Sequence, residues 1–343
     1  MAYTTVNKST DHFNTKLYTG NGGTNAVTGV GFQPDLVWLK GRSYVDGHVL
    51  YDALRGTNYI QSNTMGADSS IGTGLSSLDS DGFTLGSWSN INRNSENHVS
   101  WNWKANGAGS SNGDGSITAT VSANTTSGFS IVKYTGTGSN ATVGHGLGVA
   151  PKIIFFKDTT NGSTNWAVYN KDIGNNYRLT LNANTARQGT SSDYYQNYDP
   201  TSSIFYLGSN TRANASSAVT IAYCFADVTG FSKIGKYTGN NNSDGPFVYT
   251  GFKPAFVMVK NFDIDINWII LDNKREGYNP QKYALFPNTT NDETGDYLMD
   301  FTANGFKVRT ATSALNGSGD DLVYMAFAEA PLVGTNNIPA VAR

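Results

Sequence analysis

Short apolar runs separated by turn residues recur along the whole chain. The run at 153–156 is apolar at consecutive positions, which is typical of a strand covered on both faces. Other apolar runs of strand length lie at 131–134, 167–169, 178–181, 204–207 and 219–225. Asp-Gly and Asn-Gly pairs elsewhere in the chain suit turns that need a positive φ. The pattern therefore predicts short antiparallel strands throughout.

This pattern occurs three times in the same order. A Tyr-Thr-Gly phrase opens each repeat, at Tyr18, Tyr134 and Tyr237. Three further anchors recur: a proline before an apolar strand (Pro34, Pro151, Pro254), a ring-bearing residue (His48, Trp166, Trp268) and a closing aromatic residue (Trp103, Phe225, Phe327). A period of about 100 residues is too long for a solenoid and has the size of a whole domain. We expect the ring-bearing anchors to be buried at equivalent positions.

The repeats define the expected domains. Seven or so short strands in each repeat predict an all-β protein of three tandem antiparallel β-sandwich repeats. The expected segments are an N-terminal arm (1–11), repeats at 12–106, 128–228 and 229–330, a Gly/Ser/Asn-rich linker (107–127) and a C-terminal tail (331–343). The linker composition predicts flexibility, interrupted by a short strand at 117–121. The second and third repeats are almost contiguous and must therefore abut.

Composition changes this picture by excluding several functions. The 24 Lys and Arg residues nearly balance 26 Asp and Glu residues, so we expect no basic surface for nucleic acid. No apolar run approaches the ~20 residues of a membrane helix. The first eight residues lack the apolar core of a signal peptide. We therefore expect synthesis in a cytoplasm and no insertion into a membrane.

The sequence predicts no metal site and no cofactor. The single cysteine, Cys224, lies in an apolar run and is expected to be a buried thiol. The segment 79–82 resembles the start of a calcium-binding loop, but its twelfth position is Asn90, where such a loop needs Glu. A hairpin turn explains the Asp-Gly pair better. No two histidines have the spacing of metal ligands on a helix.

Catalysis by paired carboxylates is also disfavoured. Glycoside hydrolysis needs two carboxylates at a defined separation. Glutamate occurs only at Glu96, Glu276, Glu293 and Glu329. The nearest repeated acids, Asp52, Asp172 and Asp272, follow the ring-bearing anchor at unequal offsets and are better explained by a structural corner. We therefore expect the protein not to be an enzyme.

Aromatic residues provide the candidate ligand-binding positions. Tyr194, Tyr195 and Tyr198 cluster in a polar segment, where tyrosines offer stacking and hydroxyl contacts at low entropy cost. Trp88 is placed similarly in the first repeat. Packing against a neighbouring unit is the alternative for these rings.

Four phrases carry a resemblance to known proteins. They are SGFSIVKYTGTG at 127–138, HGLGVAPK at 145–152, NGDGSIT at 112–118 and YMAFAEAP at 324–331. The chain resembles, over nearly its whole length, a family of repeat-containing virion structural proteins of marine tailed bacteriophages, described as tail-fibre or minor tail proteins. This family has no known catalytic residues to carry over.

The resemblance implies a structural protein of the virion, assembled in the host cytoplasm. With the sandwich prediction it gives three lectin-like jelly rolls on the tail or tail-fibre apparatus, in contact with the host surface. The expected partners are other virion proteins, further copies of this chain and a host-surface glycan. A capsid decoration protein on the head is the first alternative. A glycan depolymerase is the second, and it is disfavoured by the shortage of carboxylates.

Overall fold

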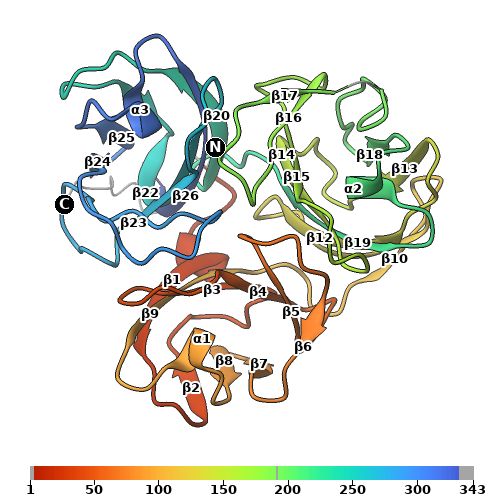
Figure 1. Ribbon diagram of the computed structural model, residues 1–343, viewed down its shortest axis with the longest axis horizontal. Coiled ribbons are helices and arrows are strands. Elements are labelled where there is room, and N and C mark those ends of the chain that lie inside the picture. The colour runs from red at the N-terminus through yellow and green to blue at the C-terminus, as the bar shows by residue number, and fades with distance from the viewer. Residues whose placement is uncertain (1–3, 191, 332–343) are drawn as a thin grey trace.

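The computed structural model describes residues 4–190 and 192–331 (Figure 1). Strands make up nearly all of its regular structure, and the prediction of an all-β protein is confirmed. The helices of the described residues are the 3-10 turn η1 (Ser9–Asp11) and three single turns, α1 (Ser89–Asn92), α2 (Thr211–Asn214) and α3 (Ser313–Asn316). Each of the three α-helical turns precedes the last strand of a repeat.

The strands form three groups, which we call units 1, 2 and 3. Unit 1 holds β1 (Phe13–Thr19), β2 (Asn25–Thr28), β3 (Leu36–Gly41), β4 (Val49–Asp52), β5 (Asn58–Gln61), β6 (Ser69–Ser70), β7 (Leu75–Asp79), β8 (Gly82–Leu85) and β9 (Asn97–Trp103). Unit 2 holds β10 (Ser110–Asn112), β11 (Ala119–Asn124), β12 (Phe129–Thr135), β13 (Ala141–Gly144), β14 (Ile153–Asp158), β15 (Ala167–Asn170), β16 (Tyr177–Arg178), β17 (Gln188–Gly189), β18 (Ile204–Leu207) and β19 (Val219–Phe225). Unit 3 holds β20 (Ser232–Thr238), β21 (Phe247–Tyr249), β22 (Phe252–Asn261), β23 (Ile269–Asp272), β24 (Met299–Thr302), β25 (Gly305–Val308) and β26 (Asp321–Pro331).

One strand order recurs in the large sheets of the three units. The shared part reads β1-β9-β3-β4 in unit 1, β12-β19-β14-β15 in unit 2 and β20-β26-β22-β23 in unit 3. All pairs within it are antiparallel. A smaller sheet accompanies each large one: β2-β8-β7, β13-β18 or β21-β25-β24. The strands that follow Pro34, Pro151 and Pro254 thus occupy equivalent central places.

The three prolines are buried and lie where a missing N–H is tolerated. Pro34 and Pro151 lie two residues before β3 and β14. Pro254 lies inside β22, but the pairing with β26 shifts register on both sides of it. A proline within a sheet is confined to strand starts, edges and bulges because it cannot donate to the ladder.

The segment predicted as a flexible linker is instead part of unit 2. Within 107–127, β10 and β11 pair with each other, and β11 pairs with β12, which extends the large sheet by two strands. The strand expected at 117–121 begins at Ala119 and continues to Asn124. Of the predicted N-terminal arm, Val6 is buried in the core. The predicted C-terminal tail lies outside the described residues except for Pro331, the last residue of β26.

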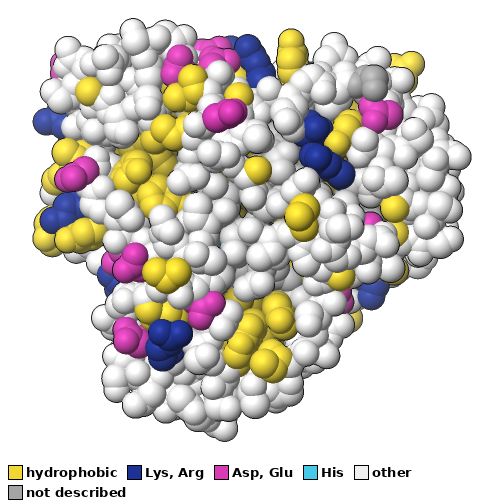
Figure 2. All heavy atoms as spheres, in the orientation of Figure 1, with side chains coloured by type: hydrophobic (Ala, Val, Ile, Leu, Met, Phe, Trp, Pro, Cys, Tyr) yellow, Lys and Arg dark blue, Asp and Glu magenta, His cyan; other side chains and the backbone are white. Residues whose placement is uncertain are grey.

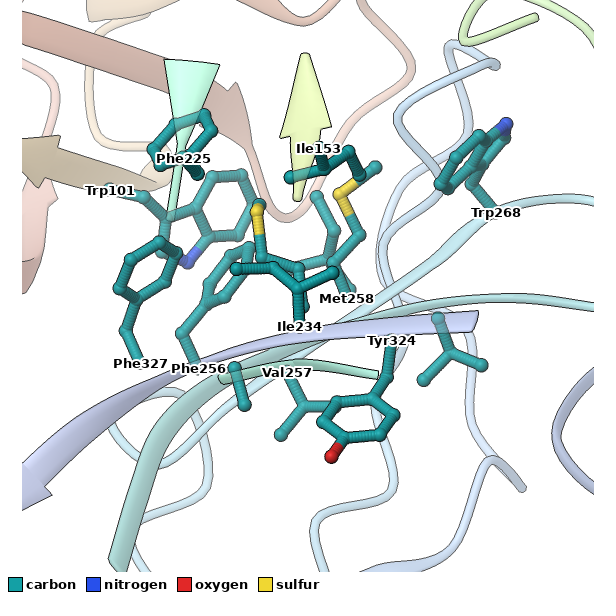
Figure 3. Close-up of a cluster of buried hydrophobic side chains, with 14 of the residues drawn as sticks. Trp101, Ile153, Phe225, Ile234, Phe256, Val257, Met258, Trp268, Tyr324 and Phe327 are labelled. Atoms are coloured by element: carbon teal, nitrogen blue, oxygen red, sulfur yellow. The ribbon is translucent and has the colours of Figure 1, made fainter. Parts of the chain in front are cut away.

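The units form a triangle in which the large sheets face one another (Figure 1). A single apolar cluster contains residues of all three units, including Trp101, Phe155 and Phe256. Unit 1 and unit 2 each have a second cluster, between the large and the small sheet. Each large sheet is therefore covered on both faces, as the apolar run at 153–156 predicted. Figure 3 shows the two faces in unit 3: Phe256 points toward Trp101 and Phe225, whereas Val257 and Tyr324 point away from them.

The closing aromatic residues of the repeats meet at the centre of the triangle. The ring centroids of Trp103 and Phe327 are 5.6 Å apart, those of Phe225 and Phe327 are 5.7 Å apart, and those of Trp103 and Phe225 are 6.1 Å apart. One ring from each unit thus contacts the other two. Because large rings dominate the energy of apolar burial, this contact ties the three units into one core.

The junctions between the units repeat in a closed ring. Backbone hydrogen bonds run from Asp68 N to Thr159 O between units 1 and 2, from Arg187 N to Phe262 O between units 2 and 3, and from Glu293 N to Arg42 O between units 3 and 1. The buried anchors contribute to the same junctions. Trp166 Nε1 donates to Gln61 O of unit 1, and Trp268 Nε1 donates to Thr180 O of unit 2, both at 3.0 Å.

The third ring-bearing anchor is His48 instead of a tryptophan, and the residue beside it is larger than in the other two units. Trp38 Nε1 donates to His48 Nδ1 at 3.0 Å, and both rings are buried. The places of Trp38 in the other units hold Phe155 and Met258, which are smaller. The smaller ring at position 48 therefore accompanies a larger one beside it, which keeps the interior close-packed.

Candidate functional site

The tyrosine segment predicted as a binding surface does not present three rings to solvent. Tyr194 and Tyr195 are buried in the core of unit 2, whereas Tyr198 is 58% exposed. The Tyr195 ring lies 5.3 Å from the ring of Tyr169. The exposed Tyr198 ring lies 5.0 Å from that of Tyr206. The chain turns tightly at Gln196 and Asn197, so Tyr194 and Tyr195 pack into the core of their own unit, whereas Tyr198 lies at the surface.

Trp88 lies at the border of the unit 1 core. It is half-buried and packs against Tyr59, with ring centroids 4.6 Å apart. Both rings retain some access to solvent, since Tyr59 is also half-buried. Trp88 therefore packs at the border of the core, and part of its side chain stays accessible to solvent.

Two of the three acids singled out in the sequence are ion-paired at the unit junctions. Asp52 accepts from Arg55 Nε at 2.7 Å and from the hydroxyl of Tyr223, which belongs to unit 2. Asp272 accepts from Arg275 Nε at 2.6 Å and from Trp101 Nε1 of unit 1 at 3.1 Å. These acids are buried between units, where they hold neighbouring sheets together.

Unit 2 lacks this ion pair. The place of Asp52 and Asp272 is taken by Asn170, because β4, β15 and β23 end at these residues. Ile173 then follows three residues later, where the other units have arginine. Asp172, expected as the third acid, is therefore not equivalent to the other two. The strand of unit 3 that corresponds to the Trp101 and Tyr223 strands carries Met325 at that place, which has no donor for a carboxylate.

A buried lysine is the next-to-last residue of β3, β14 and β22. Lys157 Nζ donates to Met65 O of unit 1 at 2.8 Å, and Lys260 Nζ donates to Asn184 O of unit 2 at 2.9 Å. Lys40 Nζ donates to Gly41 O at 2.8 Å. Burial lowers the pKa of each of these three ammonium groups to about 8.

These lysines predict that stability rises with pH in the mildly alkaline range. An unfolded lysine keeps its proton up to a pKa of about 10.4, so the unfolded chain binds more protons than the native one between pH 8 and 10. Each lysine should add on the order of 1 kcal/mol to the free energy of unfolding between pH 7.5 and 9.5. The buried Cys224 thiol acts in the opposite direction, because burial raises its pKa while the unfolded thiol ionises in this range. Above pH 10 the effect reverses, since burial raises the pKa of tyrosines such as Tyr223 and Tyr237.

Urea unfolding at pH 7.5, 8.5 and 9.5 measures this effect. Between pH 7.5 and 9.5 the Lys260→Met variant should gain about 1 kcal/mol less stability than the wild type, because one of the three lysines is removed. The same pH dependence in variant and wild type would contradict the prediction.

The histidines and the cysteine serve the packing. His145 Nε2 lies 3.1 Å from Thr201 O, His98 stacks on Tyr18, and Cys224 is buried in the core of unit 2. Burial lowers the pKa of His98 to about 4. Among residues 4–190 and 192–331, no three His, Cys, Asp or Glu side chains are grouped closely enough to hold a metal ion.

Two clefts lie at the unit junctions. The first, of about 290 Å³, lies between units 1 and 2. Its Arg55 and Asp68 pair at 3.0 Å, and its Lys133 donates to Leu54 O, so its charged groups serve the junction. The second, of about 330 Å³, lies where unit 2 passes into unit 3 and is lined by Asp227, Ser232, Lys233 and Tyr249.

The second cleft adjoins two exposed rings that the sequence analysis missed. Phe247 and Tyr249, on β21, are 48% and 56% exposed. A comparison of the second strand of each repeat would have found them, since the other two repeats have no ring at the corresponding positions. On the face drawn in Figure 2, hydrophobic side chains gather over units 1 and 3, and charged ones are few and scattered.

Comparison with known proteins places the chain in a family. In the part of the chain that the structure describes, no helix is long and apolar enough to cross a bilayer. No curated protein and no solved structure matches the chain. Residues 8–331 match the model of a family described as "Domain of unknown function (DUF7483)", and because the match spans most of the chain, the protein belongs to this family.

Proposed function

We propose that this protein is a non-enzymatic structural component of a bacteriophage virion, built of three jelly-roll-like β-sandwich units. Its place is the tail or tail-fibre apparatus, where it contacts the host surface. The observation that carries the proposal is the closed ring of three units around one shared core. Such a ring is a rigid support that presents loops and sheet faces outward, which suits attachment better than chemistry. The resemblance of the repeated phrases to phage virion proteins supports the same role.

The buried acidic residues stabilise the unit junctions, which supports a binding role of the protein over a catalytic one. The acids that recur in the repeats, Asp52 and Asp272, are paired with arginines and buried at junctions. Neither has the solvent access that a carboxylate needs to act on a glycan. The proposed partners are other virion proteins, further copies of the chain and a host-surface glycan.

A decoration protein on the capsid head is the second candidate. The three units have one strand order and one set of junction contacts, so the chain approximates a trimer. A body of this kind matches a three-fold position on a symmetric lattice as well as the axis of a trimeric fibre.

Gold-labelled antibodies against the purified protein, applied to intact particles of a phage that encodes it, test the proposal. We expect label on the tail in electron micrographs. Label on the head would replace the tail assignment by the decoration role, and particles without label would overturn the virion assignment. Incubation of the protein with host polysaccharide should release no fragments. Fragment release above that of a heat-denatured control would overturn the non-enzymatic assignment.

A further inference from the structure

Two exposed rings stand side by side on the outer face of unit 3. On β21, Phe247 and Tyr249 point to solvent, whereas Val248 between them is buried. Alternation along a strand puts residues two apart on the same face, about 7 Å from each other. The rings therefore form one aromatic platform, which we define as Phe247 and Tyr249.

The internal repeats indicate that the fold does not need this platform. The residues equivalent to Phe247 and Tyr249 are Ala26 and Thr28 in unit 1, because β2 and β21 pair in the same way with the strand before the short helix. In unit 2 they are Thr142 and Gly144. Two sandwiches of the same chain thus form with small residues at these places. Because the fold forms without these two large exposed rings, their presence indicates a ligand.

The neighbouring strand approaches the platform strand closely. Gly305 of β25 lies opposite Tyr249, and a Cβ atom at Gly305 would come within 2.1 Å of Val248 O and 3.2 Å of Phe247 Cζ. Gly82 of unit 1 meets Val27 O in the same way, so the glycine serves the approach of the two backbones in both units. The Phe247 ring lies beside this contact.

A polar cleft continues from the platform toward unit 2. Tyr249 lines the cleft of about 330 Å³ together with Asp227, Thr229, Ser232 and Lys233. The Asp227 carboxylate accepts from Lys233 Nζ at 2.8 Å and from Lys152 Nζ at 2.9 Å. Two ammonium groups thus share one carboxylate, which gives this cluster a net positive charge. Each ammonium has three N–H donors and is partly exposed, so donors remain for a ligand.

We propose that the platform and this cleft form a binding site for an acidic glycan. The apolar face of a sugar ring stacks on Tyr249 and Phe247, while its hydroxyl groups bond to the exposed Thr229 of the cleft. A carboxylate or sulfate on the glycan is attracted to Lys233 and Lys152. A lipid or an apolar peptide fits less well, because hydroxyl and charged groups line the cleft. The inference rests on the proposed host contact for its biological setting, but binding itself is testable on the isolated chain.

The decisive variant exchanges the platform for the residues of unit 1, as Phe247→Ala with Tyr249→Thr. Because unit 1 carries these residues in the same strand, the variant should fold, with a melting temperature within roughly 2 °C of the wild type. Oligosaccharides of alginate, an acidic polymer, and of dextran, a neutral one, serve as probes in calorimetric titrations of the full chain. Tyr278→Ala, which removes an exposed ring elsewhere, is the matched control.

We expect the wild type and Tyr278→Ala to bind the acidic oligosaccharide equally, and the double variant to bind at least about tenfold more weakly. Lys233→Met should weaken the binding of the acidic oligosaccharide, and this binding should depend less on salt concentration than in the wild type. Equal binding by the double variant, or no binding of either probe, would overturn the site, and equal binding of both probes would overturn the preference for acidic glycans. A protein that binds alginate but is not found on virions would keep the site and overturn the proposed function. Label on virions without glycan binding would keep the proposed function and overturn the site.

Discussion

Replacement of Trp268 by alanine is expected to lower the free energy of unfolding by about 3–5 kcal/mol. The Trp268 side chain is 1% exposed and belongs to the core shared by the three units. Its removal leaves a large cavity, since the surrounding sheets are held by many other contacts and relax only in part. It also removes the donor to Thr180 O, a carbonyl of unit 2.

The matched control is Trp88→Ala. Trp88 is also a tryptophan, but it is half-buried at the border of unit 1, so its loss should cost clearly less. Chemical denaturation of both variants and the wild type, followed by tryptophan fluorescence and circular dichroism, gives the free energies. A Trp268→Ala variant that loses less than about 1 kcal/mol would show that this residue is not part of a close-packed junction.

Replacement of Arg275 by isoleucine is expected to cost about 3–5 kcal/mol, because it leaves the buried Asp272 carboxylate without its charged partner. The double variant Asp272→Asn with Arg275→Ile should recover at least about 2 kcal/mol of this loss, since it removes the uncompensated charge. Unit 2 is the precedent within the chain, where Asn170 and Ile173 occupy these two places. The amide oxygen of the new asparagine can still accept from Trp101 Nε1.

Unit 3 is suited to this test because the other acid at the junction keeps a partner. Glu293 contacts Arg275 but is also paired with Arg42 of unit 1, at 2.6 Å. Removal of Arg275 therefore leaves Glu293 with a counter-charge. Urea unfolding of the single variants and the double variant gives the coupling free energy. If the effects of the two substitutions simply add, the pair does not act as one buried unit.

Much of the fold could be predicted from the order of residues along the chain. The apolar runs and their proline starts indicated the central strands, because a strand without polar positions must be covered on both faces. The recurrence of Tyr18, Tyr134 and Tyr237 with later anchors indicated three related units. The segment at 107–127 is not the flexible linker that its glycines and serines predict, because β10 and β11 gain stability by pairing with the edge of the sheet at β12.

The candidate binding residues were less predictable. Tyr194 and Tyr195 lie in a polar segment, and composition cannot tell which side of a tight turn faces the core. A comparison of the repeats singles out Phe247 and Tyr249 as rings, but their exposure follows only from the place of β21 at the edge of the small sheet. Whether one face of a strand or turn is exposed or buried depends on which other element packs on it.

By itself the sequence determined the strands, their threefold recurrence and the positions that had to be buried, because these follow from local polarity and from spacing along the chain. The tertiary structure alone decided which buried positions meet. Trp268 contacts Thr180, and Trp101 contacts Asp272. The rings of Trp103, Phe225 and Phe327 meet at the centre. These contacts form because each large sheet turns the face opposite its small sheet toward the other two units. Alternation specifies that a face is apolar, but the partner of that face depends on closing the ring of units, which no local pattern encodes.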